Sequence, residues 1–166
     1  MAKDVRIEQK FTEPPRRIRS ALTDPSFLTR RAQESGGSNV AVSVQTDADG
    51  LTTTVVRRLL PAQVPSFARA LVSDSIDLVE EQSWGPITEH GCTGTFVATF
   101  SAPMSGSGDM TLEPDGTGGT RMTSRISLKA SVPLVGGKLE ALVAEQTVNY
   151  LNFTEQLVRE WLAQNP

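Results

Sequence analysis

One stretch decides the fold of this chain: residues 132–165, VPLVGGKLEALVAEQTVNYLNFTEQLVREWLAQN. It opens with helix-breaking proline and glycine, and then runs from Lys138 to Asn165 without another residue of either kind. Apolar residues recur in steps of three and four, which is the period of an amphipathic helix. We therefore predict one long helix with a buried face. That face carries Leu139, Leu142, Val143, Tyr150, Phe153, Leu157 and Trp161.

Most of the chain before this helix has the two-residue alternation that is typical of β-strands. The cleanest case is 121–132, where Ile126 and Leu128 belong to an apolar face and the intervening residues are charged or hydroxylated. Other strands are predicted at 5–11, 40–44, 51–60, 76–84, 93–100 and 110–112, short helices after Pro14, after Asp24 and at 66–72, and glycine-rich turns at 106–108 and 116–119. This order predicts a single α+β domain over 1–166, with an antiparallel sheet of about seven strands wrapped around the long C-terminal helix.

Composition excludes several classes of partner. The formal net charge of −3 leaves no basic surface for nucleic acid, so we expect no nucleic-acid partner. No apolar run approaches the roughly 20 residues of a membrane-spanning helix, so we expect no transmembrane segment. The single cysteine permits no internal disulfide. Because the N-terminus carries no apolar signal segment, we expect a cytoplasmic protein.

Several short stretches, together with the order of elements, match a known pattern. A predicted strand is followed by Phe11-x-x-Pro14 with Ile18 and by the Leu22–Pro25 turn, and then by a strand meander and a long helix. This order resembles the START-like (SRPBCC, helix-grip) superfamily. Two later stretches are Pro65–Ala68, before the strand ending at Trp84, and Val132–Glu140. Together they resemble, more narrowly, an actinobacterial family of START-like domains of unknown function.

The resemblance implies a helix-grip fold with a cavity between the sheet and the last helix. It also implies the binding of a small hydrophobic molecule of the lipid, polyketide, sterol or quinone class. Two alternatives remain open: a polyketide-cyclase-like enzyme that uses Tyr150 and Glu80, and a protein-interaction domain whose cavity has collapsed. Cavity volume distinguishes them, since hundreds of Å3 favour the first two. No protein partner can be named.

Few residues are suited to catalysis. The one histidine, His90, lies in a predicted turn, and the one cysteine, Cys92, begins a strand as a small buried residue. A metal site needs several histidine, cysteine or carboxylate ligands with regular spacing. Glu80 and Glu81 are adjacent on a strand and point to opposite faces, so they cannot form an acid–base pair. We predict no catalytic residue, no metal and no cofactor.

The predicted long helix carries polar residues within its apolar face. Gln146, Tyr150 and Thr154 follow one another at four-residue intervals. Buried polar groups need partners, which are either strand residues and trapped water or a ligand in a cavity. Glu80 has the parity of Leu78 and is either buried beside it or solvated where its strand bows outward. The predicted ligand-binding residues are Gln146, Tyr150, Thr154, Val143, Leu139, Phe153, Phe67, Leu71, Glu80 and Trp84, with Phe67, Leu71 and Gly136-Gly137 at the mouth.

Overall fold

The structure is a computed structural model that describes residues 2–48, 50–59, 66–71 and 75–166. Seven strands form one antiparallel sheet with the order β1-β7-β6-β5-β4-β3-β2. The elements are β1 (Ala2–Phe11), α1 (Pro15–Leu22), α2 (Pro25–Glu34), β2 (Ser38–Thr46), β3 (Leu51–Leu59), α3 (Ser66–Arg69), β4 (Ile76–Trp84), β5 (Cys92–Phe100), β6 (Met104–Pro114), β7 (Thr120–Ala130) and α4 (Gly136–Gln164).

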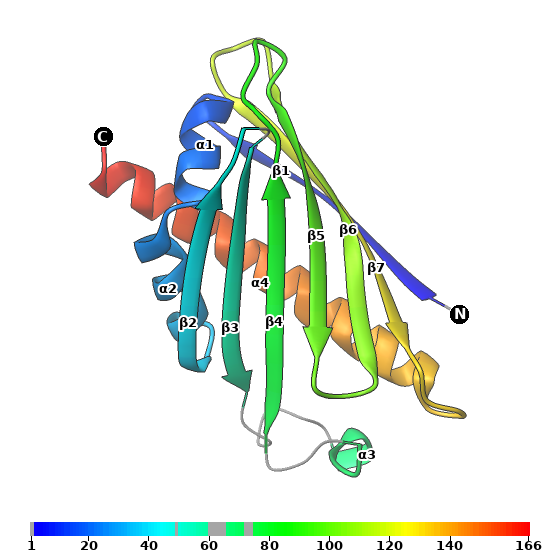
Figure 1. The fold of residues 1–166 in the computed structure, drawn as a ribbon. Helices are drawn as coiled ribbons and strands as arrows, with labels where there is room; N and C mark the ends of the chain where they lie inside the picture. Colours follow the sequence, from blue (N-terminus) through cyan, green and yellow to red (C-terminus); the bar gives the residue numbers. More distant parts are fainter. Residues whose placement is uncertain (1, 49, 60–65, 72–74) are drawn as a thin grey trace.

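The long helix α4 crosses one face of this sheet diagonally, and α1 and α2 lie beside its C-terminal half (Figure 1). The first strand joins the last one, with Val5 opposite Ile126 in an antiparallel pair. The meander β2 to β7 therefore starts at one edge of the sheet and β1 forms the other edge. The predicted α+β helix-grip fold is confirmed.

Local sequence explains where the two short helices begin. Pro15 occupies the first turn of α1, a position at which the missing backbone N–H is not needed. Asp24 caps α2, because its Oδ1 accepts hydrogen bonds from the backbone N–H groups of Ser26 (2.8 Å) and Phe27 (3.1 Å). Ile18 on α1 and Phe27 on α2 are both completely buried.

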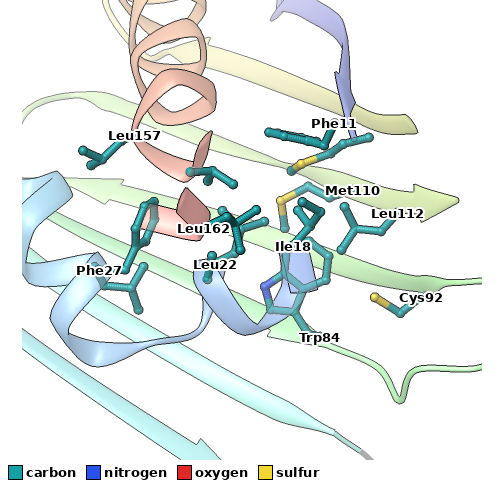
Figure 2. Packing of buried hydrophobic residues seen from close by; sticks show 14 of the residues in the cluster. Phe11, Ile18, Leu22, Phe27, Trp84, Cys92, Met110, Leu112, Leu157 and Leu162 are labelled. Carbon is teal, nitrogen blue, oxygen red and sulfur yellow. The ribbon is translucent and has the colours of Figure 1, made fainter. Parts of the chain in front are cut away.

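One hydrophobic cluster, the packed end, fills the space between α1, α2, the C-terminal half of α4 and the sheet. Figure 2 shows Ile18, Leu22 and Leu162 gathered between the helices, with the Trp84 ring beneath them. The rings of Phe27 and Trp161 meet edge to face at 5.8 Å between centroids. These contacts fix the C-terminal half of α4 against the sheet.

A second cluster packs the N-terminal half of α4 against β1 and β7. It includes Val5, Leu128 and Leu139. The carboxylate of Glu140 is buried here, and it accepts a hydrogen bond of 2.9 Å from the backbone N–H of Ala130. This bond ties the start of α4 to the last residue of β7.

Two of the predicted local structures are wrong, and the first is a turn. Residues 106–108 do not form a turn but lie inside β6, which begins at Met104. A Cβ atom at Gly108 would collide with the carbonyl oxygen of Arg125 on β7, so glycine permits close strand packing here rather than a turn. The predicted turn at 116–119 is confirmed, with positive φ at Gly116 and Gly118.

The helix predicted at 66–72 is shorter in the structure, and a different side of it is buried than expected. The structure has only Ser66–Arg69 as α3, whereas Pro65 and Val72 lie outside the described residues. Phe67, expected to face inward, is 41% exposed, and Ala68 is buried instead. A short helix of this kind can bury one small side chain without burying its aromatic neighbour.

Candidate ligand cavity

A cavity of about 460 Å3 lies between the inner face of the sheet and α4. Its lining draws on both hydrophobic clusters, since Met110 belongs to the packed end and Ile126 to the second cluster. Phe96 packs against both clusters and also lines the cavity. The cavity therefore lies where the two clusters meet, and most of its walls are apolar.

Part of the cavity wall is a buried ion pair. A guanidinium nitrogen of Arg31 donates to a carboxylate oxygen of Glu80 at 2.7 Å, and both residues are at least 95% buried. Arg31 reaches this position because it lies one helical turn after Phe27 on the buried face of α2. Glu80 alternates with inward-facing Leu78 along β4.

A second buried arginine lies next to this pair. Arg57 is 8% exposed and shares the inner face of β3 with Val55. One of its Nη nitrogens donates to the Ser35 hydroxyl at 3.2 Å, while no carboxylate pairs with it among the residues that the structure describes. The Cζ atom of Arg57 lies 4.4 Å from the centre of the Tyr150 ring. The Arg31 Cζ lies 5.1 Å from the same centre.

The protonation states in this polar end of the cavity follow from burial and neighbouring charge. Burial raises the pKa of the Tyr150 phenol above its usual value, although the guanidinium groups of Arg31 and Arg57 oppose the shift. Burial lowers the pKa of Arg57, but interactions with Tyr150 and Glu80 outweigh it and the pKa lies above its usual value. At neutral pH the phenol is therefore neutral and Arg57 is charged.

Several buried polar atoms on the cavity wall have no hydrogen-bond partner within the described part of the chain. They are Nε of Arg31, Nε of Arg57, the hydroxyl of Ser124 and the hydroxyl of Tyr150. An unsatisfied buried polar group costs about 1–3 kcal/mol. These atoms are enclosed by neighbouring side chains, and no hydrogen bond within this part of the protein uses them.

Sequence comparison now places this arrangement in a family. A family model described as "Protein of unknown function (DUF2505)" matches residues 6–162. The chain belongs to this DUF2505 family. The matched residues run from β1 to the last turns of α4, so they include every wall of the cavity.

Curated relatives of this DUF2505 protein are uncharacterised. The protein Rv0481c of Mycobacterium tuberculosis is 25% identical over 130 residues, covering 76% of this chain and 75% of the relative. The protein Mb0491c of Mycobacterium bovis matches with the same values. Both come from actinobacteria, as the sequence resemblance implied.

Solved structures with the same fold come from several organisms. The aromatase/cyclase ZhuI of Streptomyces sp. R1128 has a TM-score of 0.65 at 12% identity, covering 98% of this chain and 96% of its own. The protein TTHA0849 of Thermus thermophilus has a TM-score of 0.64 at 20% identity, covering 95% and 98%. Norcoclaurine synthase of Thalictrum flavum, in complex with dopamine and hydroxybenzaldehyde, has a TM-score of 0.58 at 12% identity, covering 96% and 88%. At these identities the likeness establishes the fold alone.

The structure brings half of the predicted ligand-binding residues to this cavity. Gln146, Tyr150, Val143, Phe153 and Glu80 line it. The other five, Thr154, Leu139, Phe67, Leu71 and Trp84, lie outside its lining.

The polar stripe predicted on the long helix is split. The Thr154 hydroxyl turns back to donate to the backbone carbonyl of Tyr150 at 2.8 Å, so it is satisfied within α4. Gln146 lines the cavity but is exposed to solvent. Trp84, expected beside the ligand, is instead packed among α1 and α4 residues, and its indole N–H donates to the Gln82 side chain at 3.3 Å. The reading of Glu80 as a solvated strand end is wrong, because Arg31 holds it in the interior.

Two buried residues that line the cavity, Arg31 and Arg57, escaped the sequence analysis. Periodicity places both on apolar faces, but it does not show that their charges stay inside. Arg31 lies on the helix face of Phe27 and Leu28, and Arg57 has the strand parity of Val55. An arginine on an apolar face is ordinarily assigned to solvent because its long stem can carry the charge outward, and here the neighbouring polar groups keep the charge inside.

The remaining candidates for chemistry lie away from this cavity. His90 has an 88% exposed side chain, as expected for a turn residue. Cys92 is buried as predicted, and burial raises the pKa of its thiol. Within the described ranges no group of three or more histidine, cysteine or carboxylate side chains is placed to hold a metal. None of the helices described there is long and apolar enough to cross a membrane.

Proposed function

We propose that this DUF2505 protein binds a small hydrophobic molecule inside the cavity between the sheet and α4. The observation that carries this proposal is a largely apolar cavity of about 460 Å3 with unpaired polar atoms in its wall. Ligand pockets for small molecules commonly have volumes of about 300–1,000 Å3 and a few placed polar groups among apolar walls.

The energetics of the walls suit such a ligand. Apolar surface removed from water contributes about 25 cal/mol per Å2, so side chains such as Phe96, Ile126 and Phe153 supply most of the affinity. Polar groups add less affinity but set the orientation, because a mismatched polar end leaves buried donors unpaired. The ligand is therefore an elongated or fused apolar body with one polar end.

The cavity volume also bears on the competing hypotheses. A protein-interaction domain with a collapsed cavity would have its interior filled by side chains, and a space of about 460 Å3 argues against it. A polyketide-cyclase-like enzyme fits the same space. It is favoured by the neutral Tyr150 phenol with the Arg57 guanidinium over its ring, because a phenol and a cation together can stabilise an enolate oxygen.

Extraction of bound molecules tests the proposal. Protein purified from its native host without detergent is extracted with organic solvent, and the lipophiles are identified by mass spectrometry. The cavity variant is Ala98→Phe, because Ala98 is buried and lines the cavity. The control is Val97→Phe on the same strand, because Val97 is 47% exposed on the opposite face.

We expect a lipophile in stoichiometric amount in the wild type and in Val97→Phe, and a loss of at least tenfold in Ala98→Phe. An equal amount in Ala98→Phe that has kept its fold would place the molecule elsewhere. Absence of any lipophile from the wild type, together with no binding of apolar probes, would overturn the proposal. Recovery of a converted product when a poly-β-ketone is supplied would favour the enzyme hypothesis.

A further inference from the structure

The charged residues of the cavity wall do not balance. Among the described residues that line it, the charged ones are Arg31, Arg57 and Glu80, which carry two positive charges and one negative charge. Glu80 is bound to Arg31 at 2.7 Å. Arg57 is more than nine-tenths buried, and its guanidinium donates to the neutral Ser35 hydroxyl and lies over the Tyr150 ring. Glu80 also attracts Arg57, but its hydrogen bond goes to Arg31, so one carboxylate serves two guanidinium groups. The described lining of the cavity therefore carries one net positive charge.

An uncompensated buried charge is costly, and proteins normally pair it. Several exposed arginines of this chain are paired even where pairing matters less, as Arg58 is with Asp77 at 2.9 Å. Leaving Arg57 unpaired therefore points to a partner that is not part of the chain. Because Arg57 lines the cavity, the partner approaches from the cavity side.

We propose that the ligand is an organic anion, a monocarboxylate on an apolar body, whose carboxylate binds between Arg57 and the Tyr150 hydroxyl. This inference rests on the proposed function and assigns its ligand class. A guanidinium presents parallel N–H groups that match the two oxygens of a carboxylate. The neutral phenol supplies one further donor. Nε of Arg31 is a third unpaired donor on the same wall, within the described residues.

The charge count selects a monocarboxylate over other anions. A phosphate monoester carries about −1.5 to −2 charges at neutral pH, which exceeds the single excess positive charge of the wall. A neutral lipid leaves Arg57 uncompensated, and an amine adds a second positive charge beside it. Phe96 and Leu128 belong to the apolar remainder of the cavity wall. This part accommodates the chain or ring system of a ligand that has no further polar groups.

Three probes with one chain and different heads test this inference: dodecanoate, dodecanol and dodecylamine. Their dissociation constants are measured by isothermal titration calorimetry at pH 7. We expect dodecanoate to bind about 10- to 100-fold more tightly than dodecanol, as charge-assisted hydrogen bonds are worth that much. Dodecylamine should bind least tightly.

Arg57→Met removes the charge and keeps an apolar stem of similar length. In this variant we expect the preference for dodecanoate over dodecanol to fall close to one, with dodecanol affinity unchanged within about threefold. Arg58→Met is the control, because Arg58 is the next residue on β3 and its side chain is at the surface. It should leave all three dissociation constants unchanged.

The outcomes separate this inference from the function on which it rests. Equal affinities for dodecanoate and dodecanol in the wild type would overturn the anion assignment and leave a hydrophobic-ligand protein. Failure of all three probes would overturn it as well, and the solvent extraction then decides whether the cavity binds any lipophile. If Arg57→Met does not fold, Arg57→Lys keeps the charge without the guanidinium fork. Arg57→Lys should retain part of the preference for dodecanoate over dodecanol. Arg57→Gln carries no charge at this position, and full retention of that preference in Arg57→Gln would overturn the role of Arg57.

Discussion

At the scale of single residues, Tyr150 concentrates the chemistry of this molecule. Its ring lies close to two guanidinium groups, and its hydroxyl has no hydrogen-bond partner in the described part of the chain. Cations stack favourably on an aromatic face when both are removed from water. The ring therefore packs against Arg31 and Arg57, and within the described residues the hydroxyl interacts only with the neighbouring charges, chiefly those of the two arginines and Glu80.

This division of roles predicts the behaviour of Tyr150→Phe. The ring remains, so the free energy of unfolding of the ligand-free protein should change by less than about 0.5 kcal/mol, since no hydrogen bond is lost. Affinity for dodecanoate should fall by about 2- to 10-fold, while affinity for dodecanol should fall less. Thermal denaturation and calorimetric titration measure the two effects. A loss of roughly 1–3 kcal/mol of stability with unaltered probe preference would assign the hydroxyl to a structural network instead.

Single residues could be placed correctly from the sequence where local periodicity alone decides which way they face. Tyr150, Val143 and Phe153 were placed on the cavity side by helix periodicity, because α4 is long and regular. Arg31 and Arg57 were missed, because only the assembled fold shows that a charge on an apolar face stays buried. Thr154 was placed on the correct face, but its hydroxyl bonds to its own helix, a choice that periodicity does not reveal.

At the scale of elements, α4 has two kinds of surface. Near its C-terminus Leu157 and Val158 are buried in the packed end. Near its middle Val143 and Leu151 form a cavity wall and are only half-buried. One amphipathic helix thus serves as a core element over part of its length and as a binding surface over another part.

Alanine substitutions along α4 should reveal this difference. Leu157→Ala should lower the free energy of unfolding by about 2–5 kcal/mol, because it opens a new cavity among well-packed side chains. Val143→Ala should cost clearly less, because it enlarges a space that already exists. Urea denaturation of both variants measures the two losses. Equal losses would mean that Val143 is packed as tightly as Leu157, and a loss below about 0.5 kcal/mol at Leu157 would remove that residue from the core.

The strands illustrate what the sequence determines at this scale. The register of β7 follows from its alternation, and its inner face carries Met122, Ile126 and Leu128 as expected. The start of β6 was not predicted as a strand, because its glycines interrupt the alternation of apolar and polar residues. Those glycines reflect close contacts with neighbouring strands, such as Gly108 against the Arg125 backbone, and a contact with another strand cannot be read from a local stretch.

At the scale of the whole molecule, the fold encloses an internal cavity between two packed hydrophobic clusters. The packed end holds α1, α2 and the C-terminal half of α4, while the second cluster holds the N-terminal half of α4 against β1 and β7. Helix α4 crosses the sheet and so connects the two clusters (Figure 1). The interior between the clusters is where apolar surface stays uncovered and where Arg57 lacks a counter-ion among the described residues. A ligand that covers this apolar surface and neutralises the net positive charge of the wall would stabilise the folded state.

This relation predicts that ligand binding and folding are linked. A ligand that binds only the folded state adds RT ln(1 + [L]/Kd) to stability, or about 2.7 kcal/mol at a hundredfold excess over Kd. Dodecanoate at that excess should raise the unfolding midpoint of the wild type in differential scanning calorimetry. At the same absolute concentration the rise should be much smaller in Arg57→Met, because its affinity is lower, and absent in Ala98→Phe.

The ligand-free variants supply the decisive comparison. Removing the charge in Arg57→Met should change the ligand-free midpoint only slightly, because the variant loses the cost of burying a charge together with the favourable interactions of Arg57 with Tyr150 and Glu80. If this variant were instead several kcal/mol less stable without ligand, Arg57 would be compensated within the protein. The uncompensated charge would then no longer argue for an anionic ligand. The combination of a stable ligand-free Arg57→Met and a lost response to dodecanoate is the result that a cavity built for an organic anion requires.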